Sequence, residues 1–251
     1  MWKNVLLITV LIFIFFLEVS KSQAFVSTTL KISAEVAEQL AELGMSKGSK
    51  EVGSILHKMA AQLPDVQRVI FLEQAYVLIL VKQGRLTSQQ ADEIIRNLSG
   101  TPGLQKTLSK MCGMNNSKAS GHSFEVLAAN ELKKSGYEII EIGKIFDDGI
   151  KNAVTDIDIV AKKGNTTYIF EMKNYSPTSI TSNSLINFRA DMQTLNSYAN
   201  KNENVKSIFV ISSKPMDINQ DKLLKAAATS QNVELIYADA YTLPILLEAL
   251  K

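Results

Sequence analysis

The stretch TDIDIVAKKGNTTYIFEMKNY, residues 155–175, carries the acidic and basic side chains best suited to chemistry in this chain. Residues 155–162 and 166–173 are rich in Ile, Val, Tyr and Phe, and the Gly-Asn dipeptide between them suits a two-residue hairpin turn. That turn places Asp158 directly opposite Glu171. Because opposed carboxylates destabilise a strand pair unless a cation neutralises them, the pair predicts a site for a divalent cation.

A lysine accompanies the two carboxylates. Lys173 lies two residues beyond Glu171, so its side chain is expected on the same face of the sheet. One interpretation is that its ammonium orients or activates a water molecule, or stabilises charge on a phosphate. The alternative is a cross-strand ion pair with Asp156, which the same register places opposite it. Both hold together if Asp156 positions the lysine.

A third carboxylate is predicted at the start of a helix over residues 124–135. Glu125 shares a helical face with Ala128, Ala129 and Leu132, the face expected to pack on the sheet. It is either a charge in the first helical turn, favoured there by the helix dipole, or a group that faces a cation. Together with Asp158 and Glu171 it would supply acidic oxygens of the kind that Mg²⁺ or Mn²⁺ prefers.

The following predicted helix, residues 183–200, carries two more polar candidates. Arg189 and Gln193 stand one turn apart beside an apolar stripe of Leu185, Phe188, Met192 and Leu195. Exposure to solvent explains them as well as a phosphate contact by Arg189 or a water-positioning role of Gln193 does. Both interpretations remain open at this point.

These candidates belong to a region of alternating helices and strands that begins near residue 121. The predicted order is αβββαβαβα, which indicates an α/β fold with a mixed central sheet and helices on both faces. Besides the hairpin and the two helices above, the predicted elements are strands 137–146, 205–212 and 233–237 and helices 217–230 and 241–250.

The chain before this region divides into three predicted parts. Residues 1–24 predict a cleaved signal peptide, because an apolar run of about 13 residues is short for a membrane span. An uncleaved membrane anchor is the alternative; after cleavage no stable membrane insertion is expected. Residues 25–114 predict a helical domain of unknown role, and the small polar residues 115–120 predict a linker to a domain over 121–251.

The composition of the chain mainly excludes certain kinds of site and interaction. Cys112 is the single cysteine, so the chain has no intramolecular disulfide and no Cys-based metal site. The formal net charge is +2, which gives no broad electrostatic argument for a nucleic-acid partner. Any contact with a polyanion must therefore come from local clustering of basic groups or from a metal ion.

The candidate residues together resemble the PD-(D/E)XK nuclease superfamily, specifically its restriction-endonuclease-like and Holliday-junction-resolvase-like branches. FEVLAANELKKSGY, residues 124–137, is similar to their helix FExxAAxxLxxxGY, and it precedes Asp158, the Glu171-Met172-Lys173 triplet and a helix with a glutamine. The resemblance covers about residues 121–213. Thr155 stands where the superfamily name has proline, so Asp156 and Asp158 compete for the metal position; the hairpin register favours Asp158.

The resemblance implies roles for these residues. Asp158, Glu171 and the backbone carbonyl of Met172 would bind the metal, and Glu125 would bind it directly or through water. Lys173 would be the catalytic lysine, and Gln193 would lie near the active site. The expected activity is Mg²⁺- or Mn²⁺-dependent endonuclease cleavage of nucleic acid, with DNA expected as the substrate rather than RNA.

The function that follows from export is that of a secreted or periplasmic nuclease, effector or toxin. The alternative is a catalytically silent module of the same fold that binds a protein partner through its helical region.

Overall fold

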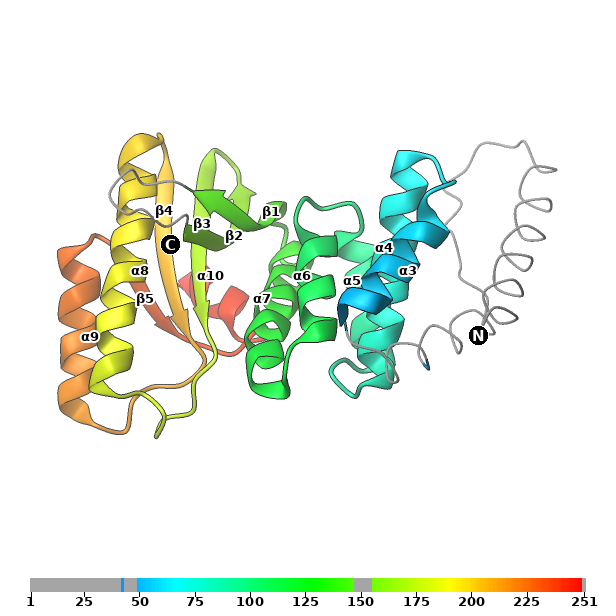
Figure 1. The fold of residues 1–251 in the computed structure, drawn as a ribbon. Helices are drawn as coiled ribbons and strands as arrows, with labels where there is room; N and C mark the ends of the chain where they lie inside the picture. The colour runs from blue at the N-terminus through cyan, green and yellow to red at the C-terminus, as the bar shows by residue number, and fades with distance from the viewer. Residues whose placement is uncertain (1–41, 43–48, 147–154, 250–251) are drawn as a thin grey trace.

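The computed structural model describes residues 42, 49–146 and 155–249 (Figure 1). The predicted signal peptide, residues 1–24, lies outside these residues. The described N-terminal part is helical, as predicted, and a mixed α/β part follows it. In chain order the elements are α3 (Ser49–Ala60), α4 (Asp65–Lys82), α5 (Ser88–Leu98), α6 (Leu104–Gly113), α7 (Asn116–Lys134), β1 (Glu138–Phe146), β2 (Thr155–Lys163), β3 (Thr166–Lys173), α8 (Ser182–Lys201), β4 (Val205–Ile211), α9 (Ile218–Ser230), β5 (Glu234–Tyr237) and α10 (Leu243–Ala249).

The five strands form one mixed sheet in the order β1-β2-β3-β4-β5. β1, β2 and β3 are antiparallel neighbours, whereas β3, β4 and β5 run parallel because α8 and α9 return the chain between them. Figure 1 shows α8 and α9 on one side of the sheet and α7 on the other. The predicted αβββαβαβα order and the predicted mixed sheet with helices on both faces are confirmed.

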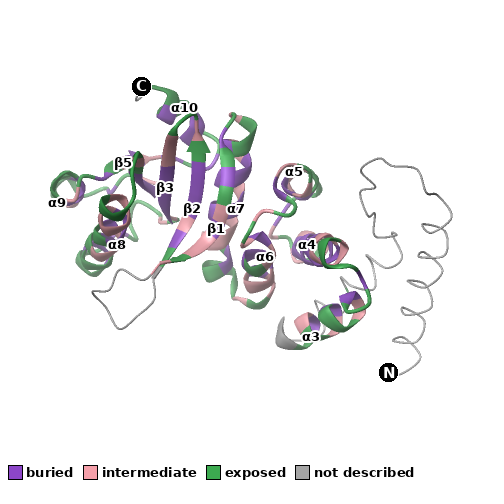
Figure 2. Cartoon of the chain, turned by 90° about the horizontal axis from the view of Figure 1, so that it is seen from above, coloured by how far each residue is buried: buried purple, intermediate pink, exposed green. Residues whose placement is uncertain are grey.

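Two apolar cores hold these layers together. The core beneath α8 and α9 contains Ile169 and Phe209 from the sheet and Phe188 and Met192 from α8. The other core begins on the opposite sheet face and continues through α7 into α3–α6, so the helical region shares it with the sheet. Figure 2 shows these helices stacked outward from α7. Burial of apolar side chains in this shared core, rather than a linker, joins the two parts.

The structure corrects the predicted linker at residues 115–120. Those residues form the beginning of α7, because the side chain of Asn115 accepts a hydrogen bond from the backbone N–H of Lys118 and caps the helix. Ala119 is fully buried one turn later. Small and polar residues therefore continue the helix here, since packing and the cap outweigh their weak helix preference.

The β2–β3 hairpin has the predicted two-residue turn, with Gly164 at φ +61°. Its register runs from Lys163 opposite Thr166 to Ile159 opposite Phe170 and matches the prediction over this length. The ladder stops there, one pair before Asp158 would face Glu171. The two strands separate at this point.

Side-chain alternation also changes at this end of β2. Ile159 packs in the core shared with the helical region, whereas Ile157 packs in the core beneath α8. Strict alternation would place both side chains on one face, so β2 is distorted between them. The distortion sets the surroundings of Asp158.

None of the helices over the described part of the chain is both long and apolar enough to cross a membrane.

Candidate functional site

At the end of the hairpin, the side chain of Asp158 takes the place of a backbone partner for β3. Its Oδ2 accepts a hydrogen bond of 2.6 Å from the backbone N–H of Met172 on β3. Burial raises the pKa of this carboxyl group well above its usual range, and the negative charges of Glu171 and Glu125 raise it further. Lys173 and the Met172 N–H oppose that effect. Asp158 is therefore within electrostatic reach of Glu171, Glu125 and Lys173.

Glu171 is the single acidic residue of β3 and is 8% exposed. Burial raises its pKa to about 7, against the lowering influence of Lys173, while Asp191 and Glu125 raise it further. At neutral pH this carboxyl group is therefore near its titration midpoint. A cation beside it would favour its ionised form.

Lys173 is held between two acids. Its Nζ pairs with Oε1 of Glu171 and lies 2.9 Å from Oδ2 of Asp191 on α8. Burial alone would lower the pKa of this ammonium, but the surrounding carboxylates outweigh burial and raise it. Lys173 is therefore a cation at neutral pH. The predicted ion pair with Asp156 is replaced by these two contacts, because Asp156 is exposed and lies opposite Ile145 of β1.

Glu125 lies on α7, near the sheet end that carries the other acids. The residue is 7% exposed, and its two carboxylate oxygens lie 3.0 and 2.9 Å from Nδ1 of His122. The negative charge of Glu125 raises the pKa values of both Asp158 and Glu171, and whether Glu125 faces a cation stays a prediction.

Arg189 and Gln193 lie outside this group of carboxylates. Both are exposed on α8, and the residue of that helix which reaches Lys173 is Asp191. Residues two apart on a helix point about 200° apart, so Arg189 and Gln193 face away from the side that Asp191 presents. Their predicted substrate-contacting and water-positioning roles gain no support from this arrangement.

Sequence reasoning missed His122 and Asp191. The spacing of His122 and Glu125, three residues apart on one helix, is a signal that was available in the sequence, since such residues are neighbours on a helix surface. Asp191 gives no comparable signal. Its contact with Lys173 depends on the rotation of α8 against the sheet, which tertiary packing determines.

The donor set suits a hard cation. Asp158 and Glu171 offer oxygen ligands, and burial raises the pKa of each carboxyl group. Within the described ranges, however, no three or more His, Cys, Asp or Glu side chains are grouped closely enough to hold a metal ion by themselves. Mg²⁺ fits such a site, because it is usually held by one or two carboxylates and keeps several water ligands.

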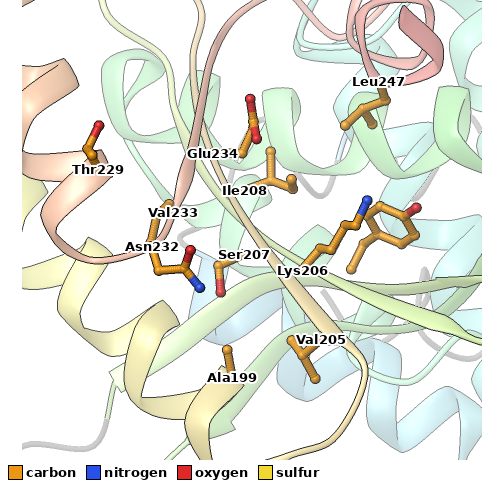
Figure 3. Close-up of a pocket in the computed structure, with 11 residues that line it drawn as sticks. Ala199, Val205, Lys206, Ser207, Ile208, Thr229, Asn232, Val233, Glu234 and Leu247 are labelled. Atoms are coloured by element: carbon orange, nitrogen blue, oxygen red, sulfur yellow. The ribbon is translucent and has the colours of Figure 1, made fainter. Parts of the chain in front are cut away.

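A separate hollow of about 360 Å³ opens at the opposite end of β4 (Figure 3). Lys206 and Glu234 contribute its charged groups, and the ammonium of Lys206 lies 6.0 Å from the ring centre of Tyr168. Because Ile211 at the other end of β4 pairs with Lys173, this hollow is distant from the carboxylates. The two sites do not share residues.

Comparison with known proteins finds a similarity over the region that holds the carboxylates and Lys173. Residues 120–216 match the family model of NERD, the nuclease-related domain. The match confirms the resemblance to PD-(D/E)XK nucleases for this part of the chain. It includes Glu125, Asp158, Glu171, Lys173 and Asp191.

Among solved structures, Can2 from Sulfobacillus thermosulfidooxidans in complex with cyclic tetra-adenylate (cA4) is similar, with a TM-score of 0.34 and 14% sequence identity. The alignment covers 86% of this chain and 55% of Can2, so the chain spans about half the length of that protein. No curated protein matches the chain.

Proposed function

We propose that this protein is a metal-dependent phosphodiesterase that acts as an endonuclease on nucleic acid. DNA is the favoured substrate over RNA. The observation that carries the proposal is the grouping of the buried Glu171 with the half-buried Asp158 and Lys173 at the open end of the β2–β3 hairpin. The cluster lies in the part of the chain that matches the nuclease-related domain. Mg²⁺ or Mn²⁺ is the proposed cofactor.

In this proposal Asp158, Glu171 and the carbonyl oxygen of Met172 hold the cation, and Glu125 holds it directly or through water. When bound, the cation would supply positive charge that stabilises the charge developing on the phosphate and would lower the pKa of water. His122 fixes the orientation of the Glu125 carboxylate through its contact at 2.9 Å.

Lys173 acts as a donor rather than as a base. Its raised pKa keeps the ammonium protonated at neutral pH, so it supplies positive charge and N–H groups to a phosphate oxygen. Asp191 positions the ammonium from the α8 side at 2.9 Å. Substrate binding would replace part of the contact between Lys173 and Glu171.

Two substitutions test this proposal. Glu171→Ala and Lys173→Ala are expected to abolish cleavage of plasmid and linear DNA in Mg²⁺, because each removes a charge from the reacting centre. Lys162→Ala, at an exposed lysine of β2, is the matched control and should cleave normally. EDTA should stop the wild-type reaction, and Mg²⁺ or Mn²⁺ should restore it. Cleavage by both purified site variants would refute the assignment.

A second candidate function has one observation in its favour. Lys173 is already engaged by Glu171 and Asp191, which is also the arrangement of a purely structural ion-pair network. The protein would then be a silent nuclease-fold module that binds a protein partner through α3–α6. Absence of any metal-dependent cleavage of plasmid, linear DNA and RNA would favour this function.

We further propose that residues 1–24 direct export, which would make the protein a periplasmic or secreted nuclease, effector or toxin. Retention of the segment as a membrane anchor is the alternative. N-terminal sequencing of the mature chain distinguishes the two, because a cleaved chain begins near residue 25.

A further inference from the structure

A cavity of about 480 Å³ lies where the helical region meets the candidate active site. One wall is the turn after α4, with Arg85, and the other is the first half of α7, with Ser120 and Phe124. Asn174, which directly follows Lys173, also lines it. The cavity therefore adjoins the carboxylate cluster, because α7 carries both Glu125 and several lining residues and Asn174 follows the last residue of β3.

One end of this cavity is suited to an anion. The guanidinium of Arg85 donates hydrogen bonds to the backbone carbonyls of Met111 and Met114, the second at 2.6 Å, and approaches Oδ1 of Asn116 at 3.4 Å. These oxygens are uncharged, and Arg85 forms no ion pair with a carboxylate in the part of the chain that the structure describes. The carboxylate that also lines the cavity, that of Asp239, accepts hydrogen bonds from the backbone N–H groups of Tyr241 and Thr242. The Nε atom of Arg85 is buried and has no hydrogen-bond partner among the described residues. The N-terminal turn of α7, where Asn116 lies, adds a partial positive charge.

The rest of the cavity is suited to a flat ring with polar edges. Phe124 is buried in the wall, and Tyr241 is 52% exposed at the rim. The hydroxyl groups of Ser120 and Ser123 donate hydrogen bonds to backbone carbonyls of α7, so their oxygens can accept hydrogen bonds from a ligand. The amide of Asn174 donates to the carbonyl of Ser120 and accepts from the hydroxyl of Ser212. Aromatic side chains stack on bases of single-stranded nucleic acid with little sequence preference.

We propose that this cavity binds one unpaired nucleotide of the substrate beside the scissile phosphate, with its own phosphate toward Arg85 and its base against Phe124 and Tyr241. The volume lies in the range of small-molecule sites and admits a single nucleotide. This inference rests on the proposed nuclease function. It also gives the segment after α4 a role, because Arg85 in that segment supplies the cation of the site.

Binding of mononucleotides tests the cavity without cleavage. Isothermal titration of the full-length protein in EDTA should detect AMP or dAMP, with inorganic phosphate binding more weakly. Ser120→Trp, at an exposed lining residue of α7, fills the cavity and should weaken nucleotide binding about ten-fold or more. Ser117→Trp, at an exposed residue of the same helix outside the cavity lining, is the control and should bind like the wild type.

A second variant separates the two ends of the cavity. Tyr241→Leu removes the ring at the rim and should weaken AMP binding while leaving phosphate binding unchanged. Thermal melting of each variant verifies that the fold is intact. The proposal is overturned if AMP does not bind the wild type, if phosphate binds as tightly as AMP, or if neither variant weakens AMP binding.

Cleavage kinetics then distinguish this inference from the proposed function. Ser120→Trp should raise KM for a single-stranded oligonucleotide about ten-fold and leave kcat nearly unchanged. Nucleotide binding without cleavage would refute the nuclease function and retain the cavity as a nucleotide site. Cleavage without nucleotide binding would retain the nuclease and refute the cavity.

Discussion

Replacing Glu171 by glutamine should make the metal-free protein more stable at alkaline pH. Glu171 is nearly buried, and burial raises its pKa from 4.5 to about 7. The native state therefore resists ionisation of this side chain, whereas the unfolded state does not. A glutamine has almost the same volume and never ionises, so it removes the free-energy cost of ionising this side chain in the native state.

The size of the effect follows from the two pKa values. Their difference of about 2.5 corresponds to roughly 3 kcal/mol at 1.36 kcal/mol per pKa unit. Below pH 4.5 Glu171 is protonated in both states and costs nothing. As the pH rises to 7 the unfolded state ionises first, so the free energy of unfolding falls; above pH 7 the full cost remains.

Urea unfolding in EDTA at several pH values from 5 to 8 measures this cost. The difference in stability between Glu171→Gln and the wild type should grow with pH toward about 3 kcal/mol in favour of the variant. Glu138→Gln, at an exposed position of β1, should show no such growth. Adding Mg²⁺ at pH 8 should stabilise the wild type more than Glu171→Gln. A difference independent of pH would refute the account of a raised pKa at Glu171.

The remaining predictions concern a turn and an ion pair. A Cβ atom on Gly103, at φ +85°, would lie 1.8 Å from the carbonyl oxygen of Ile142, so Gly103→Ala should destabilise the protein by about 3 kcal/mol or more in urea unfolding. Gly100→Ala, at φ +81° with no atom within 4 Å, carries only the backbone strain and should cost about 1 kcal/mol; equal losses would contradict the proposed clash. Asp191→Asn leaves Lys173 without its contact on α8 and should lower kcat about ten-fold with KM nearly unchanged, as single-turnover cleavage can measure; an unchanged kcat would show that Asp191 does not position the lysine.

The hairpin was predictable because its determinants are local. Gly164 supplies the positive φ that the tight turn requires, and the turn sets the register as far as Ile159 opposite Phe170. The separation of the strands beyond that pair is not local. It depends on the packing of Ile157 beneath α8 and on the hydrogen bond between Asp158 and the Met172 N–H.

The sequence predicts which helix faces pack on the sheet, but it does not predict which residues meet there. The stripe of Phe188 and Met192 on α8 is buried as predicted, yet no pattern indicates that Asp191 would meet Lys173. The same holds for α3–α6. Their apolar faces predict burial, but an apolar face does not specify what covers it, and here it joins the core that begins on the sheet.

That shared core bears on how the chain can change in evolution. The nuclease-related match begins at residue 120, inside α7, whose other residues pack on both the sheet and the preceding helices. A recombination event that joined this match to another protein would split a helix and expose apolar side chains on both fragments. The two halves are therefore expected to be inherited together, and transferable only as a piece that begins well upstream of α7.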